Sequence, residues 1–474
     1  MAKNVDILVL DDPLIELEEL SVDDYESGTD NQSSTLKNNS VRSNTTNVSP
    51  IIKINDFIVN ASYLQEFEID CTGFVPECSV TFFDVTGEFS ELNYPKDGDL
   101  MKVYIGSGGK EDTWKPIRID FQILDIEPFT EDGVNGFNIS GDMEIPSFEL
   151  EKCEVYKEMS SFDACRAISK NLKLGFSSNI QGTDDVQTWI NNYGTDKNLL
   201  NKIIKHSYKD ENSFMTMFID PYYYVNFVEC NAIINDADND DRTISQLDEI
   251  KYISDMINAD PDFKDVEENT APDFITNSNT YLSSNIGIIS FGQVNRCSSI
   301  TQNIGKKIYT RYWDDNEEEY RVEFITPFIS EGQNLLQMTQ SENNEKSVKE
   351  NTKKLIMRAQ TDNMHKNYNY SEICNRLNLQ EIEKYGINVT LAGFNPQIMR
   401  YQKKYVAIYS HSYFAAMDVD SMNADNSEER KSDEVLNPEL SGFYTVTGIS
   451  YSLVDGYLTT NLEMRKRAIK TYNM

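Results

Sequence analysis

The three histidines are the first candidates for chemistry, because imidazole binds metals and transfers protons near neutral pH. His206 falls in a predicted helix, His365 in a polar segment and His411 beside a predicted strand. They form neither an HExxH motif nor any other close metal-ligand spacing. Isolated histidines are far more often packed or solvated side chains than ligands. We therefore predict that none of the three binds a metal or acts in catalysis.

An acidic stretch offers a second candidate, a calcium site. Asp236, Asp238 and Asp240 have the spacing of the first ligands of an EF-hand loop. The sixth position of such a loop would be Asp241, where the motif needs glycine, and the twelfth would be Leu247, where it needs glutamate. A solvated acidic loop is the favoured interpretation, and a weak divalent-cation site is the alternative.

Motifs for catalysis or phosphate binding are missing from the sequence. It contains no GxSxG, no P-loop and no GxGxxG after a predicted strand, and the GSGG stretch at 106–109 is predicted to be a turn. With 78 Asp and Glu residues, paired carboxylates occur almost anywhere and identify no glycosidase. We predict no catalytic residue, no cofactor-binding residue and no metal ligand, and hence a chain that is not an enzyme.

The charge and the cysteines narrow the class of protein further. A formal net charge of −35 argues against a general binder of nucleic acid or anionic membranes. The basic triplet at 465–467 is a local exception, and it is either a solvated chain end or a partner-facing patch. Seven cysteines without a CxxC motif fit a reducing cytoplasm. We find no signal-peptide pattern and no apolar run of membrane length.

Hydrophobic periodicity predicts the elements that must position these residues. Residues 1–50 are predicted to be an N-terminal anchor followed by a Ser/Thr/Asn-rich linker. Residues 51–145 show short strands separated by Gly, Asp and Asn turns, which predicts a first antiparallel barrel or sandwich. Residues 231–285 form an acidic insertion with one helix expected near 244–257. Residues 286–474 are predicted to be a second β domain that carries a helical, polar insertion near 335–385.

Residues 146–230 change character and predict an α+β domain. Ser160 and Asp163 have the spacing of a capping box before apolar residues at helical intervals. A second helix is expected to begin at Thr195. The segment ENSFMTMFID, residues 211–220, is predicted to be a third, short helix, and a strand is expected after Pro221.

A Gly-Phe-x-Pro corner occurs in both β regions, at Gly73–Pro76 and at Gly393–Pro396. In each region we expect the corner to end one strand, a later strand to carry 103–105 or 406–409, and a hairpin with a Gly-bearing turn to close the module. The sequence therefore predicts one β module built twice, with the corner as a folding device and not a chemical site.

Several stretches resemble the baseplate hub proteins of contractile-tailed bacteriophages, the T4-like tail hubs related to VgrG and gpD-like hubs. They are YLQEFEIDCTGFVPECSVTFFDVTGEF, GDLMKVYI, MSSFDACRAISKNLKLGFSSNIQGTDDVQTWI, KIIKHSYKDENSFMTMFIDPYYYVNFVEC and LSGFYTVTGISYSLVDGYLTTNLEMRKR. The resemblance covers about 51–230 and 286–470 in pattern and element order. It implies a mainly β, α+β fold with two related tube-type antiparallel β-barrel domains, an α+β domain and insertions.

The resemblance also implies a function, that of a structural hub in the virion tail baseplate, made in the bacterial cytoplasm. A homotrimer would present six similar domains and join a tail tube initiator protein to a central spike protein. Wedge or tape-measure proteins are further expected partners, DNA is only a passing cargo in an acidic channel, and no membrane anchor is expected. The alternatives are the hub of a related contractile injection system, a carboxylate-based cell-wall hydrolase and a carbohydrate-binding β protein.

Overall fold

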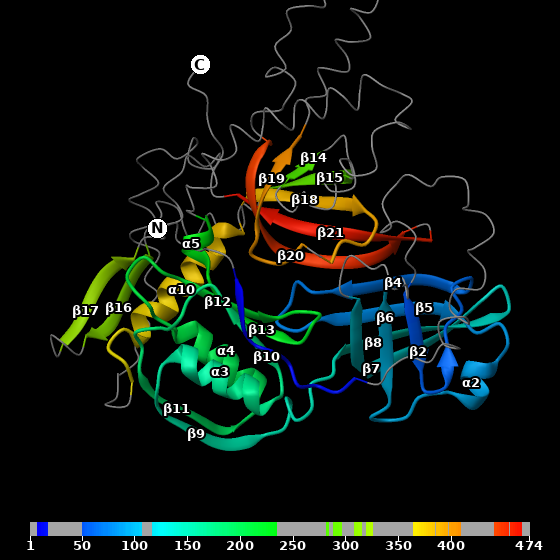
Figure 1. Ribbon diagram of the computed structural model, residues 1–474, viewed down its shortest axis with the longest axis horizontal. Coiled ribbons are helices and arrows are strands. Elements are labelled where there is room, and N and C mark those ends of the chain that lie inside the picture. The colour runs from blue at the N-terminus through cyan, green and yellow to red at the C-terminus, as the bar shows by residue number, and fades with distance from the viewer. Residues whose placement is uncertain are drawn as a thin grey trace, which may run out of the picture.

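The computed structural model describes residues 7–17, 50–106, 116–234, 281–283, 288–295, 308–314, 319–325, 364–383, 385–396, 398–408, 440–454 and 456–466. A large curled antiparallel sheet lies beside a smaller α+β unit (Figure 1). The mainly β, α+β class predicted from the sequence is confirmed. The expected helix near 244–257 and most of the N-terminal linker lie outside the described residues.

The first part of the large sheet comes from residues 51–143. Its strands alternate buried apolar and more exposed polar residues, as the strand Glu77–Phe83 does, where Ser79 and Thr81 alternate with the buried Val80 and Phe82. Phe89 of the helix α2 (Glu88–Leu92) packs against Phe82. The strands are β2 (Ile51–Ile54), β3 (Phe57–Ile58), β4 (Leu64–Asp70), β5 (Glu77–Phe83), β6 (Leu100–Ile105), β7 (Ile117–Glu131) and β8 (Val134–Met143).

The second part of the same sheet comes from residues 281–465. Its strands are β14 (Tyr281–Ser283), β15 (Ile288–Asn295), β18 (Tyr385–Ala392), β19 (Lys403–Ala407), β20 (Gly442–Val454) and β21 (Tyr457–Arg465). β20 pairs antiparallel with β4, and this pairing makes the two parts one 13-stranded sheet. The strands β16 (Ile308–Asp314) and β17 (Glu319–Ile325) form a separate antiparallel pair.

The α+β unit contains a four-stranded sheet in the order β1-β10-β13-β12 and a two-stranded sheet of β9 and β11. Its strands are β1 (Leu8–Asp11), β9 (Lys152–Met159), β10 (Gly175–Ser178), β11 (Gln187–Gly194), β12 (Met215–Ile219) and β13 (Tyr224–Glu229). Its helices are α3 (Ser161–Asn171), α4 (Asp196–His206), α5 (Cys230–Ile234) and α10 (Tyr368–Ile382).

The two helix starts predicted in this unit are confirmed. The Ser160 hydroxyl accepts a hydrogen bond from the backbone N–H of Asp163 at 3.1 Å, and the Asp163 carboxylate accepts one from that hydroxyl at 2.8 Å. Thr195 caps α4 in the same way by accepting from the N–H of Asn198. The strand predicted after Pro221 is β13.

The predicted third helix is wrong, because residues 215–219 form the strand β12 paired with β13. Met217 faces the main core while Phe214 and Phe218 face a second apolar cluster. Successive residues therefore point to opposite sides, which is the period of a strand. Because both sides are apolar, the polar alternation that identifies most strands is missing from this segment.

Two segments far away in the chain complete the α+β unit. β1 adds an edge strand beside β10, and Asp11 forms an ion pair with Arg166 of α3. α10, which lies in the expected 335–385 insertion, packs against α4. The amide of Asn375 donates to the carbonyl oxygens of Ile204 and Ser207, which satisfies the C-terminal end of α4.

Candidate functional site

The two described histidines have structural roles. His206 is buried, stacks on Tyr368 with ring centroids 3.5 Å apart, and its Nδ1 donates to the carbonyl oxygen of that residue. His365 Nε2 donates to the carbonyl oxygen of His206 at 3.0 Å, and burial lowers the pKa of His365. Both rings therefore join α10 to the end of α4. His411 lies outside the described residues.

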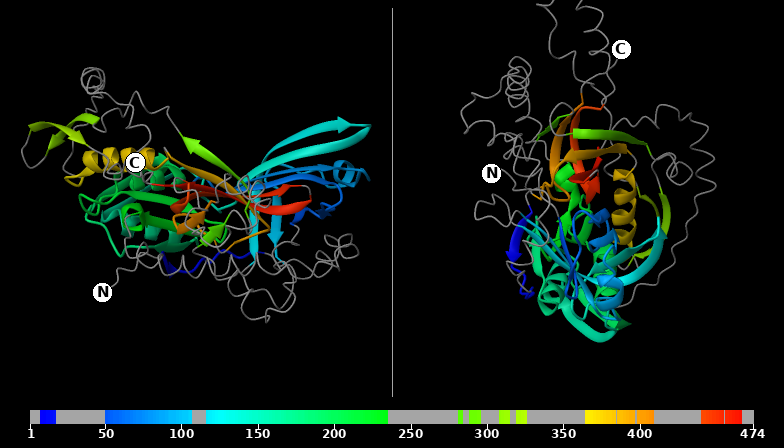
Figure 2. Two further views of the ribbon diagram at one scale, coloured as in Figure 1. Left: turned by 90° about the horizontal axis from the view of Figure 1, so that it is seen from above. Right: turned by 90° about the vertical axis from the view of Figure 1, so that its right-hand side faces the viewer.

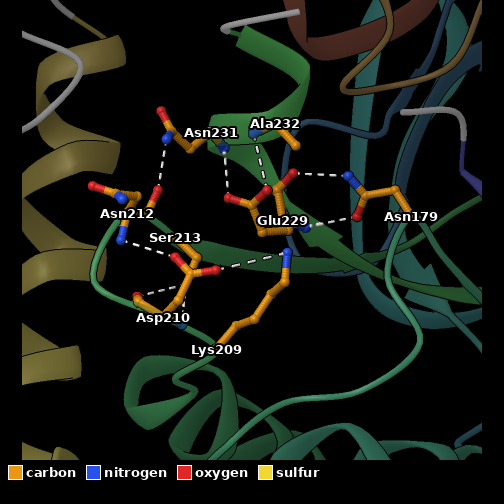
Figure 3. A network of polar contacts seen from close by, with 8 residues as sticks. All are labelled: Asn179, Lys209, Asp210, Asn212, Ser213, Glu229, Asn231 and Ala232. Carbon is orange, nitrogen blue, oxygen red and sulfur yellow. Dashed lines mark hydrogen bonds and ion pairs between the residues drawn. The ribbon is translucent and has the colours of Figure 1, made fainter. Parts of the chain in front are cut away.

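Glu229 is a buried acid with one feature of catalytic groups, because burial raises its pKa. Its two carboxylate oxygens accept from the backbone N–H groups of Asn231 and Ala232, both at 2.9 Å (Figure 3). These are orphan donors of the first turn of α5, so the carboxylate acts as a helix cap. Asn179 exchanges two hydrogen bonds with the Glu229 backbone and fixes the position of this cap.

The other sequence candidates lead to no reactive site. The acidic loop with Asp236, Asp238 and Asp240 lies outside the described residues, as does the stretch 107–109. Among the residues that the structure describes, no group of His, Cys, Asp or Glu has the arrangement of a metal site. None of the described helices has the length and apolar composition that crossing a membrane requires.

The first residue of the basic triplet, Arg465, is neither a solvated chain end nor part of an exposed patch that could face a partner. Arg465 is buried and its guanidinium pairs with Glu383 and Glu463, both at 3.0 Å. Lys466 donates to the carbonyl oxygen of Ser441 at 2.9 Å. Residue 467 lies outside the described part of the chain. The two described charges are therefore used inside the second part of the sheet.

The two parts of the large sheet have the same strand order. In space the first runs β4-β5-β8-β7-β6-β2, and the second runs β15-β18-β21-β20-β19-β14. Matched one to one, these strands also follow the same order along the chain. The outermost strands of the two parts, β2 and β14, run in different directions. β2 is antiparallel to its neighbour β6, whereas β14 is parallel to its neighbour β19. We refer to the two parts as the first and second repeats.

Irregularities in the ladders occur at matching positions in both repeats. The β7–β8 hairpin has a bulge between Ile123 and Asp125, and the β20–β21 hairpin has one between Val446 and Gly448, each the same distance from its turn. A second pair of bulges lies in β4 and β15. Bulges are specific local features, so their coincidence argues for duplication more strongly than strand order does. The β4 and β15 bulges lie between Leu64 and Glu66 and between Ile288 and Ser290.

The Gly-Phe-x-Pro corners do not mark equivalent places, and the prediction that they do is wrong. The first corner lies between β4 and β5, whereas the second lies between β18 and β19. Because β18 matches β5, the two corners lie at opposite ends of equivalent strands. Their backbones also differ, since Gly393 has φ +80° while Gly73 needs no positive φ. Register does match Val103 of β6 to Val406 of β19, while β19 ends at Ala407 and residue 409 of the expected segment lies outside the described residues.

Arg400 ties the repeats together near the intrachain junction, the pairing of β20 with β4. Its Nε donates to the carbonyl oxygen of Thr447, which lies in the β20 bulge, at 2.8 Å. Its Nη1 donates to the carbonyl oxygens of Cys71 and Gly73 at 3.0 and 2.7 Å. The guanidinium carbon lies 4.3 Å from the ring centre of Phe218 in β12. One side chain thus joins both repeats to the α+β unit.

A row of polar side chains crosses the large sheet from β7 to β15. Adjacent members of the row are directly opposite each other on neighbouring strands, so they share one face. Burial and the neighbouring carboxylates of Asp142 and Asp70 raise the pKa of Glu77. Carboxylates directly opposite each other on neighbouring strands lower the stability of the fold, so stability does not explain why these three acids lie together. The row is Gln122, Asp142, Glu77, Asp70, Ser450, Asn461, Thr390 and Ser290.

Two strand edges at opposite ends of this row remain open among the described strands. β15 pairs only with β18, and the half of β7 beyond residue 123 pairs only with β8. That half of β7 projects outward with β8 (Figure 2). Exposed edges invite pairing with another chain. The polar row and the two open edges together form the candidate site, which is suited to assembly.

Neither the polar row nor the open edges can be predicted from patterns within single strands. Register between distant strands is needed to see that Asp70, Glu77 and Asp142 are neighbours, and single-strand patterns contain no such register. The Asp-Gly turns at 132–133 and 455–456 were a usable signal, because each fixes a hairpin from which the matching register can be counted. Asp132 and Gly133 both have positive φ, as a two-residue turn of this kind requires.

The fold is similar to those of solved tail proteins. It resembles the 43 kDa tail protein of prophage MuSo2 from Shewanella oneidensis with a TM-score of 0.51 and 8% identity, over 89% of this chain and 98% of that one. A tail protein from Neisseria meningitidis MC58 matches at 0.45 and 9% identity over 88% and 96%. The E. coli c3393 protein, a type VI secretion component, matches at 0.38 and 6% over 89% and 79%. No family model and no curated protein matches the sequence.

Proposed function

We propose that the chain is a structural subunit of a phage tail baseplate, a hub that assembles as a homotrimer. The observation that carries this proposal is the internal repeat, matched in register and bulges and joined edge to edge within one chain. Two repeats per chain let three chains present six similar units around a ring. Such a ring fits a six-fold tube on one side and a three-fold spike on the other.

The polar row supports a role for the sheet in lining the central channel. In a closed ring the rows of neighbouring repeats would join into a belt whose acidic part repels DNA phosphates. Hydroxyl and amide groups in the second repeat add hydrogen-bonding capacity without positive charge. DNA is then a cargo that passes through and does not bind. The tube initiator and the spike are the proposed partners of the two faces of the ring.

The proposed role is not enzymatic. The carboxylate of the buried Glu229 acts as a helix cap, and the two described histidines have structural roles. We therefore expect the purified chain to release no fragments from peptidoglycan, and we expect no affinity for soluble glycans. A hub of a related contractile injection system would use the same assembly surfaces, so the partner tube protein distinguishes the two settings.

Mass measurement tests the assembly directly. Light scattering of the full chain on a sizing column should give three times the chain mass of 54.4 kDa. Averaged particle images should show a ring with three-fold symmetry and six similar lobes. A stable monomer that joins neither a tube protein nor a spike protein would overturn the proposed function.

A further inference from the structure

We propose that the open half of β7 in one chain pairs with β15 of a second copy, in a register fixed by the intrachain junction. The proposal rests on the homotrimer proposed above, and it specifies which edges meet and how. Within one chain β20 pairs with β4, and these strands match β7 and β15 in the other repeat. The chain therefore contains one example of the contact, and among the described strands the equivalent pair of edges is open.

The register of this interchain junction follows from the repeat. In the intrachain junction Ser450, Tyr451 and Ser452 lie opposite Asp70, Ile69 and Glu68. Counting from the turns of the matching hairpins, the β7 residues equivalent to these three β20 residues are Glu127, Pro128 and Phe129. Counting from the matching bulges, the β15 residues equivalent to the three β4 residues are Val294, Gln293 and Gly292. The predicted pairs are Glu127 with Val294, Pro128 with Gln293 and Phe129 with Gly292.

The exposure of residues in the open half of β7, and the hydrogen bonding of their N–H groups, are those expected of a strand edge without its partner. At the intrachain junction Ile449 and Tyr451 are 4% and 3% exposed. Their equivalents are Ile126, which is half-buried, and Pro128, which is exposed. The N–H of Ile126 donates to the carboxylate of the adjacent Asp125, so it is not used in the ladder with β8. The direction of backbone hydrogen bonding alternates along a strand, so the backbone nitrogen of Pro128 also faces the open edge. The N–H that proline lacks therefore costs no hydrogen bond between β7 and β8.

The charges select β15 over a second β7 as the partner. The open half of β7 carries Asp125, Glu127 and Glu131, whereas β15 reads IISFGQVN and has no charge. Pairing β7 with another β7 would place carboxylates next to carboxylates, which is unfavourable. Pairing it with β15 creates no such contact.

The repeat also predicts a hydrogen bond between the two chains. At the intrachain junction the N–H of Cys71 donates to the carbonyl oxygen of Ile449 at 2.9 Å. The equivalent groups between chains are the N–H of Asn295 and the carbonyl oxygen of Ile126.

A disulfide between designed cysteines tests the edges and the register together. Glu127→Cys with Val294→Cys places the pair at a non-hydrogen-bonded position, where Cα atoms are about 4.5 Å apart and a disulfide fits. The full chain is used with Cys153→Ser, because Cys153 is the exposed cysteine among those described, and with Cys297→Ser. Mild oxidation should convert most of the chain into covalent dimers and trimers, and nothing larger than a trimer.

The matched control is Glu127→Cys with Gln293→Cys, one position out of register and therefore on opposite faces of the sheet. It should cross-link far less. If light scattering of the reduced protein shows a trimer but the 127–294 pair does not cross-link, this proposal fails while the proposed function stands. A control pair that cross-links better overturns the register. A reduced protein that is always monomeric overturns both proposals.

Two single variants test the same junction without cysteines. Pro128→Tyr copies Tyr451 and restores an N–H at the open edge, so trimers should dissociate at concentrations about twofold to tenfold lower. Gln293→Pro removes an N–H that faces the edge and should move dissociation to higher concentration by a similar factor, with unchanged circular dichroism. The proposal is contradicted if neither variant moves the dissociation midpoint.

Discussion

Arg400 shows at the scale of one residue how the parts of the chain are held together. Three carbonyl oxygens, from both repeats, accept hydrogen bonds from its guanidinium, which also lies over an aromatic ring of the α+β unit. The planar fork of arginine reaches several acceptors at once, which a lysine ammonium does not do in this geometry. The side chain therefore supports the corner after β4 at the place where β20 joins it.

Arg400→Ala should destabilise the fold strongly, because it leaves the carbonyl oxygens of Cys71, Gly73 and Thr447 without this donor. We expect the free energy of unfolding to fall by about 3 kcal/mol, measured by urea denaturation. Arg400→Lys should recover only part of the loss. A loss below about 0.5 kcal/mol for Arg400→Ala would contradict the assigned role.

Lys404 is a buried cation at a position where the first repeat has an apolar residue. Register matches it to Met101, which is fully buried, and Lys404 itself is 2% exposed. Burial lowers the pKa of Lys404 from 10.5 to about 7. Between these values the unfolded lysine binds more protons than the folded one, so lowering the pH across this window costs stability. Below pH 7 the cost stays constant.

Lys404→Met should therefore stabilise the chain at pH 7, by roughly 2–4 kcal/mol. The gain should shrink as the pH rises toward 10, because releasing the lysine's proton on folding costs less free energy as the pH approaches the unfolded pKa of 10.5. Denaturation of both proteins at pH 7 and pH 10 measures this. Lys403→Met, at the neighbouring half-buried position, is the control and should change stability little. A variant that is less stable than the parent would show that the ammonium has a favourable partner.

At the scale of elements, the sequence predicted those whose signals are local. Ser160 and Thr195 mark helix starts through their own hydroxyls, and the β7–β8 and β20–β21 hairpins are marked by Asp-Gly turns. The sequence pattern of β12 does not distinguish a strand from a helix, because both of its faces are apolar. The corners do not mark equivalent places, because Gly and Pro recur at strand ends in general. Three matching residues therefore carry no information about register.

The second corner is nevertheless part of the core. Phe394 is fully buried and lies against Tyr451 of β20 with ring centroids 4.8 Å apart. Phe394→Asp should lower the free energy of unfolding by about 3–5 kcal/mol and reduce trimer formation, as seen by denaturation and light scattering. Phe74→Asp, in the half-buried first corner, is the comparison and should cost less. Normal assembly by Phe394→Asp would argue against this packing.

At the scale of the whole molecule, the acidic row should decide how an assembled ring treats DNA. Changing Asp70, Glu77 and Asp142 to Lys should make the ring retain duplex DNA in a gel-shift assay, with binding that weakens as salt rises. The parent ring should retain none. Asp56, Asp97 and Asp132, all in exposed turns, provide a control with the same change in net charge. DNA retention by the parent ring, or equal retention by both variants, would contradict a channel-lining role.

The whole-molecule features were the least predictable from the sequence. The net charge of −35 indicated an acidic surface but not which acids gather on one sheet face. That β20 joins β4, or that α10 closes the end of α4, depends on contacts between residues at least 162 positions apart. Local patterns do not encode such contacts. Composition therefore narrowed the class of protein, while the repeat and its open edges required the three-dimensional structure.

The intrachain junction has a consequence for biosynthesis. A ribosome releases β4 early, but its partner β20 begins only at Gly442. During the whole interval the β4 edge is unpaired, and α4 also lacks α10. Contacts of such long range slow folding and leave edges exposed to neighbouring nascent chains. A truncated product that ends before residue 442 would therefore keep one edge of β4 unpaired, and we expect it to aggregate more readily than the full chain.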